Sequence, residues 1–404
     1  MKFVDLEAQQ NRIKALIDRN MQAVLSHGRF INGPEVKELE GSLAEYVGVE
    51  HAIGCASGTD ALLMALMANK AGPGDAIFTT PFTFIATAEV IRLLGATPVF
   101  VDISPDTFNL DPVRLETAIQ AVLKNDPSIH PIPDPAQQLR PKGIIPVDLF
   151  GLPADYDLIN AIARSHGLFV IEDAAQSFGA ERNGRKCGSL ADVGCTSFFP
   201  AKPLGCYGDG GMCFTDNDEI AEALESIRVH GMGGNKYDNV RIGINGRLDT
   251  LQAAILLAKF WIFPEEVRLR QEKATVYRDA LARGASNTLS LTPQSIPPGL
   301  KSAWAQYSIL AQDEEHRAKI QNALKNAGIP TAVYYPKPLH LQKAFSYLGY
   351  REGDFPVSED SARRIFSVPM HPYLAERDQE MIVETICRVS TAECTAQPSV
   401  SAGS

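Results

Sequence analysis

The sequence predicts an α/β protein built on a mostly parallel β-sheet with helices on both faces. Short β-rich runs alternate with helical stretches between about residues 76 and 173. A chain of 404 residues also exceeds one minimal core, which favours a large domain with a smaller companion. We therefore expect a large domain over 1–260, a small C-terminal α/β domain over 261–389 and a disordered tail over 390–404.

The predicted elements begin with two helices. Apolar residues at helical spacing predict the first over 6–25, and the second is expected to begin near Pro34. Helical stretches such as FIATAEVIRLLG and YDLINAIARSHG then lie between the β-rich runs, as crossover connections of a parallel sheet require. The four predicted strands of this region are AIFTT at 76–80, TPVFVDI at 97–103, KGIIPVDLFG at 142–151 and LFVIED at 168–173.

The pattern changes after Cys195. Two close strands, CTSFF and GGMCFT, precede helices that are predicted over 218–228 and 248–260. The remainder contains a charged helix, the strand candidates SAWAQYSILA and TAVYY, and a further helix near 314–327. The segment NDPSIHPIPDPAQQLRP has five prolines between 127 and 141, so we expect an exposed loop there.

Composition argues against several classes of function. The net charge is -10 and Lys and Arg form no stripe, so neither nucleic-acid nor membrane-surface binding is indicated. The N-terminus lacks the apolar core of a signal peptide, which predicts a cytoplasmic protein. The seven cysteines are an odd number without CxxC spacing, so neither a disulfide framework nor a metal site is indicated.

Lys202 lies in the segment TSFFPAKPLGCYGDGGMCF, with no acidic residue within six positions on either side. A solvated lysine on an edge strand would have polar neighbours, whereas the neighbours of Lys202 are mostly apolar residues and glycines. A desolvated lysine has a lowered pKa, which leaves free amine able to attack a carbonyl group. Lys202 is therefore a candidate nucleophile.

Two further motifs could bind parts of one ligand. In ASGTDALLMAL, Ser57, Gly58 and Thr59 end a strand-like run and begin a helix, where a phosphate could bind; a plain helix cap is the alternative. In FVIEDAAQSFG, Asp173 ends an apolar strand and Gln176 follows three residues later; this too could be a cap. An amine, a carboxylate and a phosphate site together match the requirements of pyridoxal 5′-phosphate (PLP).

The segment GINGRLDTLQAAIL places Asn245 and Arg247 just before a helix. The planar guanidinium group of arginine suits a carboxylate or a phosphate, although a solvent-facing arginine at a helix start fits equally well.

At these residues the chain resembles the DegT/DnrJ/EryC1/StrS family of sugar aminotransferases. The family has the aspartate aminotransferase fold (PLP fold type I), which implies a large domain with a mostly parallel seven-stranded sheet and a smaller C-terminal α/β domain. The segments that carry the resemblance are FVDLEAQQ, INGPEV, SGTDAL, TPFTFIATAE, VIEDAAQSFGA, SFFPAKPLGCYGDGG, NGRLDTLQAAIL and SVPMHPYL.

The resemblance implies a role for each matched position. Lys202 would bind PLP covalently and move protons, and Asp173 would contact the ring nitrogen. Gln176 would approach the ring hydroxyl and Phe84 would stack on the ring. The remaining implied contacts are Gly58, Thr59, Ser197 and a neighbouring subunit's Asn245 for the phosphate, and Arg247 of that subunit with Tyr334 for the substrate.

The resemblance also implies partners and a substrate class. It implies a homodimer with shared active sites, L-glutamate as amino donor giving 2-oxoglutarate, and pyridoxamine phosphate (PMP) as the intermediate cofactor form. The segments KPLGCYGDGG, RLDTLQAAIL and VPMHPYL are most similar to those of enzymes that aminate C3 of a UDP-linked 2-acetamido-2-deoxy-3-oxo-glucuronate in O-antigen and related polysaccharide synthesis. A dTDP-linked 3-keto or 4-keto deoxyhexose is an alternative substrate, and a non-catalytic regulatory protein is an alternative function.

Overall fold

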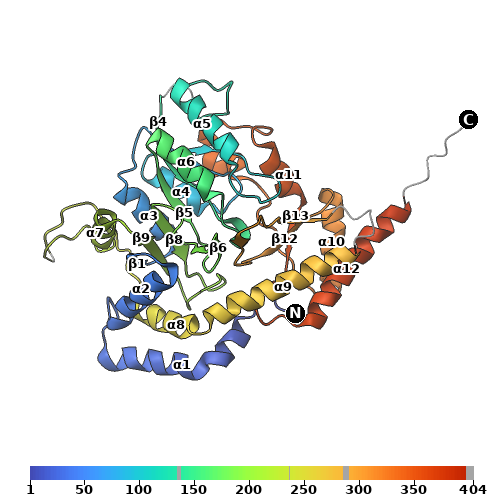
Figure 1. Cartoon of the computed structure of the whole chain (residues 1–404), viewed down its shortest axis with the longest axis horizontal. Coiled ribbons are helices and arrows are strands. Elements are labelled where there is room, and N and C mark those ends of the chain that lie inside the picture. Colours follow the sequence, from blue (N-terminus) through green and yellow to red (C-terminus); the bar gives the residue numbers. More distant parts are fainter. Residues whose placement is uncertain (134–137, 236, 285–290, 397–404) are drawn as a thin grey trace, which may run out of the picture.

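The computed structural model describes the 404-residue chain except for residues 134–137, 236, 285–290 and 397–404. Its main body is an α/β unit, and a smaller unit with the long helices α9 and α12 extends from it (Figure 1). Within the described part of the chain, no helix is long and apolar enough to cross a membrane.

The main sheet has seven strands in the order β1-β9-β8-β5-β4-β2-β3. Strand β5 pairs in parallel with β4 and β8, and β2 pairs in parallel with β3 and β4. Strand β9 runs antiparallel to both of its neighbours. The predicted mostly parallel sheet is therefore confirmed, with strands β1 His51–Cys55, β2 Asp75–Thr79, β3 Thr97–Phe100, β4 Arg140–Ile145, β5 Phe169–Asp173, β8 Val193–Ser197 and β9 Gly211–Thr215.

Helices cover both faces of this sheet because successive strand residues point to opposite sides. In β2, Phe78 packs in a cluster with residues of α5 and α6, whereas Ile77 packs in a cluster with residues of α3, α4 and α7. Both faces are thus buried, as parallel sheets require. These helices are α3 Gly58–Ala68, α4 Ala86–Leu93, α5 Pro112–Lys124, α6 Tyr156–His166 and α7 Asp218–Ile227.

The two N-terminal helices, α1 Leu6–His27 and α2 Pro34–Val47, form where they were predicted. Helix α1 lies along α8 Thr250–Phe260 at the edge of the main body (Figure 1). Buried apolar residues hold the two helices together, namely Ile13, Ile17, Ile255, Ala258 and Ile262.

The smaller unit has its own apolar core around a three-stranded sheet in the order β10-β12-β13. The predicted domain boundary at 260/261 falls between α8 and α9, and the domain limits stay a prediction. The elements of this part are α9 Phe263–Gly284, β10 Thr292–Pro293, β12 Tyr307–Leu310, α10 Glu314–Asn326, α11 Pro356–Arg364, β13 Ile365–Val368 and α12 Glu376–Ala396. The shorter elements of the chain are η1 Leu149–Gly151, β6 Glu181–Arg182, β7 Arg185–Lys186, β11 Leu300–Lys301, η2 Leu339–Leu341 and η3 Lys343–Leu348.

The predicted strand TAVYY does not form. The segment makes a single β-bridge, between Ala332 and Ser367. Its aromatic residues raised the predicted β-propensity, but Tyr335 instead contacts Gln176, and Tyr334 packs against the ring of Phe3.

Two surface predictions also need correction. Helix α12 continues past residue 390, where a disordered tail was predicted, because Ser390 is buried and bonds to His316 of α10. In the proline-rich loop, His130 is buried and donates a hydrogen bond to the carbonyl of Phe100, so that part of the loop is not exposed. Residues 134–137 of the loop and 397–404 of the tail lie outside the described residues.

Lys259 is an unusual residue in α8 because its side chain is 0% exposed. Its ammonium group lies 4.3 Å from the ring centroid of Tyr207, and among the described residues its Nζ has no hydrogen-bond partner. Burial lowers the pKa of Lys259 from 10.5 to about 8. Between pH 8 and 10.5 the unfolded chain therefore binds more protons than the folded chain, so the stability of the fold rises with pH across this window. Below pH 8 the buried charge of Lys259 lowers the free energy of unfolding by its full amount.

We expect Lys259→Met to stabilise the protein at pH 7 by up to about 3 kcal/mol, because methionine fills the site without a buried charge. The advantage over the wild type should shrink as the pH rises from 8 to above 10, where the wild-type lysine loses its proton in both states. Denaturant unfolding at pH 7 and pH 10 measures this, with Lys37→Met, at an exposed lysine of α2, as the matched control. Equal stability of the Lys259→Met and wild-type proteins at pH 7 would contradict it.

Candidate active site

The predicted site residues converge at the carboxyl edge of the main sheet. Asp173 is the last residue of β5, and Ser197 is the last residue of the adjacent strand β8. Helix α3 begins at Gly58, just after β1 ends at Cys55. In open α/β sheets, ligands bind in the crevice at this edge.

The first turn of α3 lies against Ser197. A Cβ atom on Gly58 would come within 2.6 Å of the Ser197 Cβ, so only glycine allows this close approach. Ser57 caps the helix by accepting a hydrogen bond from the Asp60 amide at 3.0 Å. The cap proposed as an alternative to the phosphate site is therefore real. It leaves other first-turn amides, including that of Thr59, without partners inside the helix, as an anion site requires.

Asp173 is 5% exposed and is held by two donors. Its Oδ2 accepts a hydrogen bond from the Thr87 hydroxyl at 2.8 Å, and its Oδ1 accepts one from the Ala175 amide at 3.2 Å. Burial raises the pKa of Asp173, whereas both hydrogen bonds and the charge of Lys202 oppose that rise. Thr87 was not singled out from the sequence, although it lies in the matched segment TPFTFIATAE.

Lys202 lies in the turn after β8, with its backbone amide bonded to the Phe199 carbonyl. Burial lowers the pKa of the Lys202 amine, and the charge of Asp173 opposes that effect. The fold thus supplies the acidic neighbour that the local sequence lacks. A half-buried amine with a lowered pKa beside a buried carboxylate is an arrangement typical of functional sites.

Gln176 is fixed at both ends of its side-chain amide. Its Oε1 accepts a hydrogen bond from the Phe150 amide at 2.9 Å, and its Nε2 donates one to the Tyr335 hydroxyl at 3.3 Å. Tyr335 is a site residue that sequence reasoning missed. The signal was present in the motif TAVYYP, where the neighbouring Tyr334 was chosen instead.

The remaining predicted residues lie in different settings. Phe84 precedes α4 with 56% of its surface exposed, and Tyr334 is half-buried beside Phe3. Asn245 is exposed and Arg247 is half-buried, in a segment that bonds to the chain just before Ser57 through the Ala56 amide and the Gly246 carbonyl. The roles proposed for these residues, including action across a dimer interface, stay predictions.

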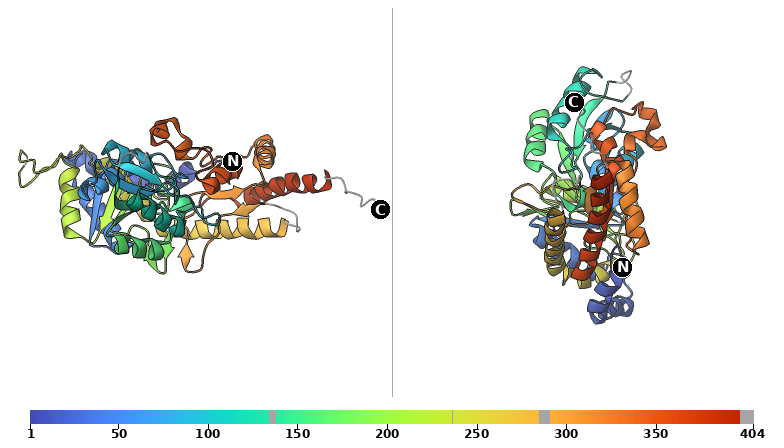
Figure 2. Two further views of the ribbon diagram at one scale, coloured as in Figure 1. Left: turned by 90° about the horizontal axis from the view of Figure 1, so that it is seen from above. Right: turned by 90° about the vertical axis from the view of Figure 1, so that its right-hand side faces the viewer.

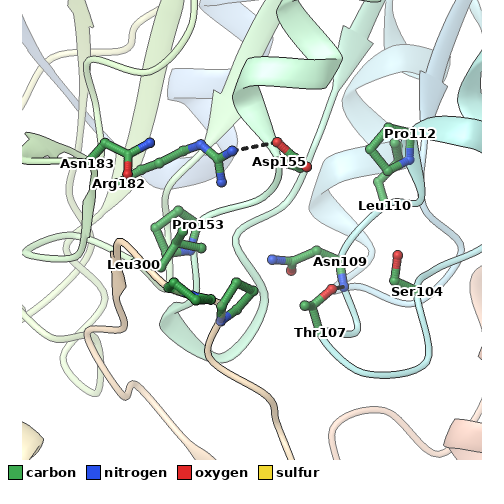
Figure 3. Close-up of a pocket in the computed structure, with 12 residues that line it drawn as sticks. Ser104, Thr107, Asn109, Leu110, Pro112, Pro153, Asp155, Arg182, Asn183 and Leu300 are labelled. Carbon is green, nitrogen blue, oxygen red and sulfur yellow. Dashed lines mark hydrogen bonds and ion pairs between the residues drawn. The ribbon is translucent and has the colours of Figure 1, made fainter.

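A separate cavity lies elsewhere and is lined by none of the predicted site residues. It has a volume of about 210 Å³ and is bordered by Asn109, Pro153 and Leu300 (Figure 3). Its guanidinium group, from Arg182, is already paired with Asp155 at 2.5 Å. The two charged groups of its lining, Arg182 and Asp155, are therefore paired with each other.

The sequence matches the DegT/DnrJ/EryC1/StrS aminotransferase family over residues 11–387. The chain belongs to this family. Among its relatives in the family, the UDP-2-acetamido-2-deoxy-3-oxo-D-glucuronate aminotransferase of Pseudomonas aeruginosa is 48% identical over 374 residues, 93% of this chain and 96% of the relative.

Solved structures support the same assignment. A DegT/DnrJ/EryC1/StrS aminotransferase from Brucella abortus matches with a TM-score of 0.89 and 49% identity, covering 96% of this chain and 99% of that chain. NtdA from Bacillus subtilis, solved with bound cofactor PMP, matches with a TM-score of 0.85 and 29% identity, covering 97% of this chain and 85% of that chain. The predicted family and its α/β fold are thus confirmed.

The residues of this family member fit a PLP molecule by their chemistry. Because residue 58 is a glycine, the first turn of α3 lies against Ser197, which brings the amides of that turn and the Ser197 hydroxyl together. Lys202 supplies an amine with a lowered pKa, and Asp173 supplies a buried acceptor. The phosphate of PLP would meet the first turn of α3, its aldehyde would meet the Lys202 amine, and its ring nitrogen would meet the Asp173 carboxylate.

Proposed function

We propose that this protein is a PLP-dependent aminotransferase that moves the amino group of L-glutamate to C3 of a UDP-linked 2-acetamido-2-deoxy-3-oxo-glucuronate. The observation that carries the proposal is that Asp173, the last residue of β5, and Lys202, in the turn after the adjacent strand β8, lie close enough for each charge to affect the pKa of the other. The sugar and its nucleotide rest on the similarity to the Pseudomonas aeruginosa enzyme.

Bound PLP would act as an electron sink for the carbanion that forms when the donor loses its α-proton. The chain's own residues do the rest. Lys202 would hold the cofactor through its amine, and the same amine, when free, would carry the proton that the substrate carbon gives up. Burial favours this role because it keeps part of the amine unprotonated.

Asp173 would hold a proton at the ring nitrogen of the cofactor. Its two oxygens are already oriented by Thr87 and Ala175, so the carboxylate cannot turn away. The first turn of α3 together with Ser197 would orient the phosphate, and Gln176 would present its Nε2 to the ring hydroxyl. Such positioning contributes to rate because the reacting groups meet without further reorganisation.

The substrate assignment is tested by separate half-reactions. With L-glutamate, the PLP-loaded protein should change its visible absorption and release 2-oxoglutarate. With the aminated cofactor in place, it should use a UDP-linked 3-keto uronate at least about 100-fold more efficiently than a dTDP-linked keto deoxyhexose, since a sugar without the carboxylate would leave the guanidinium group of Arg247, the predicted substrate-binding residue, without that partner. Preference for the dTDP sugar would overturn the substrate assignment, and no spectral response to glutamate would overturn the donor.

A homodimer and a place in O-antigen or related polysaccharide synthesis belong to the same proposal. A non-catalytic regulatory role would be favoured if neither half-reaction occurred although PLP bound. Intact Lys202, Asp173 and Gln176 argue against that outcome.

A further inference from the structure

Asp148, a residue to which the proposed mechanism gives no task, is 0% exposed and follows β4. Its carboxylate accepts hydrogen bonds from the Ala154 amide at 2.9 Å, the Tyr156 hydroxyl at 2.9 Å and the Ser177 hydroxyl at 2.6 Å. The first two donors lie in the segment after Asp148, and the third lies in the turn after β5. One carboxylate therefore ties these two segments together.

The segment that Asp148 anchors contains the group that orients Gln176. The Phe150 amide donates to Gln176 Oε1 at 2.9 Å, so Nε2 is the donor end of that amide; one of its two N–H groups goes to the Tyr335 hydroxyl at 3.3 Å and the other is left for a ligand. Phe150 has a φ of 62°, a left-handed conformation that a bulky residue adopts only when its surroundings hold it there. The Asp148 amide also donates to the Asp173 carbonyl at 3.2 Å, so the same residue contacts the strand that carries the site.

Glu172 lies beside Asp148 and is equally buried. Its oxygens accept hydrogen bonds from the Gly188 and Leu190 amides at 2.7 and 2.9 Å. Burial raises the pKa of both carboxyl groups, that of Asp148 to about 6 and that of Glu172 further above its usual range. Desolvation is the largest cause of both shifts, and the hydrogen bonds that each carboxyl group accepts oppose it.

Asp148, Glu172 and Cys187 place one ligand atom each within 4.8 Å of one another, as a metal site would require. The four carboxylate oxygens, however, already accept hydrogen bonds from the chain. A cation would have to share those oxygens with their donors, so the contacts favour a structural role for the cluster.

We propose that Asp148 is a positioning residue for the cofactor site, which acts through the Phe150 amide on Gln176. The inference rests on the proposed function, because the ligand that Gln176 would meet is the ring hydroxyl of PLP. In the folded protein, Asp148 fixes the loop, the loop fixes the Gln176 oxygen, and the Gln176 N–H is thereby aimed at the ligand.

A double-mutant cycle tests this route. We expect Asp148→Asn to weaken PLP binding by about tenfold. The side-chain NH₂ group of asparagine would replace one carboxylate oxygen and would face a hydrogen-bond donor that this oxygen accepts from in the wild type. In the background of Gln176→Ala, the same change should alter PLP binding by less than about twofold, since the group through which Asp148 acts is gone. PLP dissociation constants are measured by visible absorption, without any sugar substrate.

Asp102→Asn is the matched control. Asp102 is also 0% exposed and accepts hydrogen bonds from the Val357 and Ser358 amides at 2.9 Å and the Ser358 hydroxyl at 2.6 Å, at the start of α11. The Asp102→Asn variant should lower the midpoint of thermal unfolding, as Asp148→Asn does, but should leave the PLP dissociation constant within about twofold of the wild type.

An equal loss of PLP affinity from Asp148→Asn in both backgrounds, or no loss in either, would overturn the inference. If Asp148→Asn does not fold, Tyr156→Phe removes one donor with the ring kept in place, and the same cycle is run with it. A wild-type protein that binds no PLP would refute the proposed function instead, so the two failures are distinguishable.

Discussion

Lys202→Ala is expected to bind PLP through its non-covalent contacts yet to show no measurable turnover. The loss of positioned proton transfer alone costs about 10²- to 10⁴-fold in rate. The loss of the covalent anchor adds to that, because alanine has no amine to hold or release the cofactor. The measurement is the rate of 2-oxoglutarate formation from L-glutamate, with bound PLP quantified in the same sample.

Two controls separate chemistry from folding. Lys37→Ala, at an exposed lysine of α2, should keep wild-type activity and PLP content. Lys202→Arg keeps a positive charge near Asp173 but has no free amine near neutral pH, so it should be as inactive as the alanine variant. Turnover by Lys202→Arg within about tenfold of the wild type would remove Lys202 from the proton-transfer role.

The sequence alone identified the residues whose signal is local. Lys202 was unusual among its apolar neighbours, and Asp173 stood at the end of an apolar strand. A parallel sheet gathers strand ends at one edge, so the two could be predicted to meet. In the structure the charge of Asp173 raises the pKa of Lys202 and that of Lys202 lowers the pKa of Asp173, which fits that expectation.

The partners of these residues could not be predicted in the same way. Thr87 and Asp173 are 86 positions apart, and Tyr335 and Gln176 are 159 apart, so only the tertiary fold brings each pair together. The role of Asp148 could not be predicted from the local sequence either. Its importance comes from three donors in two segments, and nothing in the motif PVDLFG indicates that they converge.

Errors in the predicted fold have a related cause. TAVYY has the composition of a strand, but Tyr335 bonds to Gln176 and Tyr334 packs on Phe3 instead of joining a sheet. The region after 390 has the composition of a tail, but Ser390 docks on His316 and the helix persists. Local propensity is a weak guide wherever a tertiary contact overrides it.

Asp173→Asn is expected to fold like the wild type but to lose about 10²- to 10³-fold in turnover. The amide is nearly isosteric, its oxygen can still accept from the Ala175 amide, and the Thr87 hydroxyl can reverse its role and accept from the new N–H. A neutral amide cannot hold a proton on the ring nitrogen of the cofactor, so the electron sink weakens. Thermal unfolding together with single-turnover rates measures both halves of this prediction.

The same variant should also change Lys202 in the absence of cofactor. In the wild type, burial lowers the pKa of Lys202 and the Asp173 charge raises it. With that charge removed, burial acts unopposed, so the amine should lose its proton at a lower pH than in the wild type. An amine-acylating reagent applied to the apoprotein across pH 6 to 9 should therefore modify Lys202 faster in Asp173→Asn than in the wild type. The control variant Thr87→Val keeps the charge of Asp173, so its profile of modification against pH should resemble that of the wild type. Identical profiles for Asp173→Asn and the wild type would show that the two side chains do not interact.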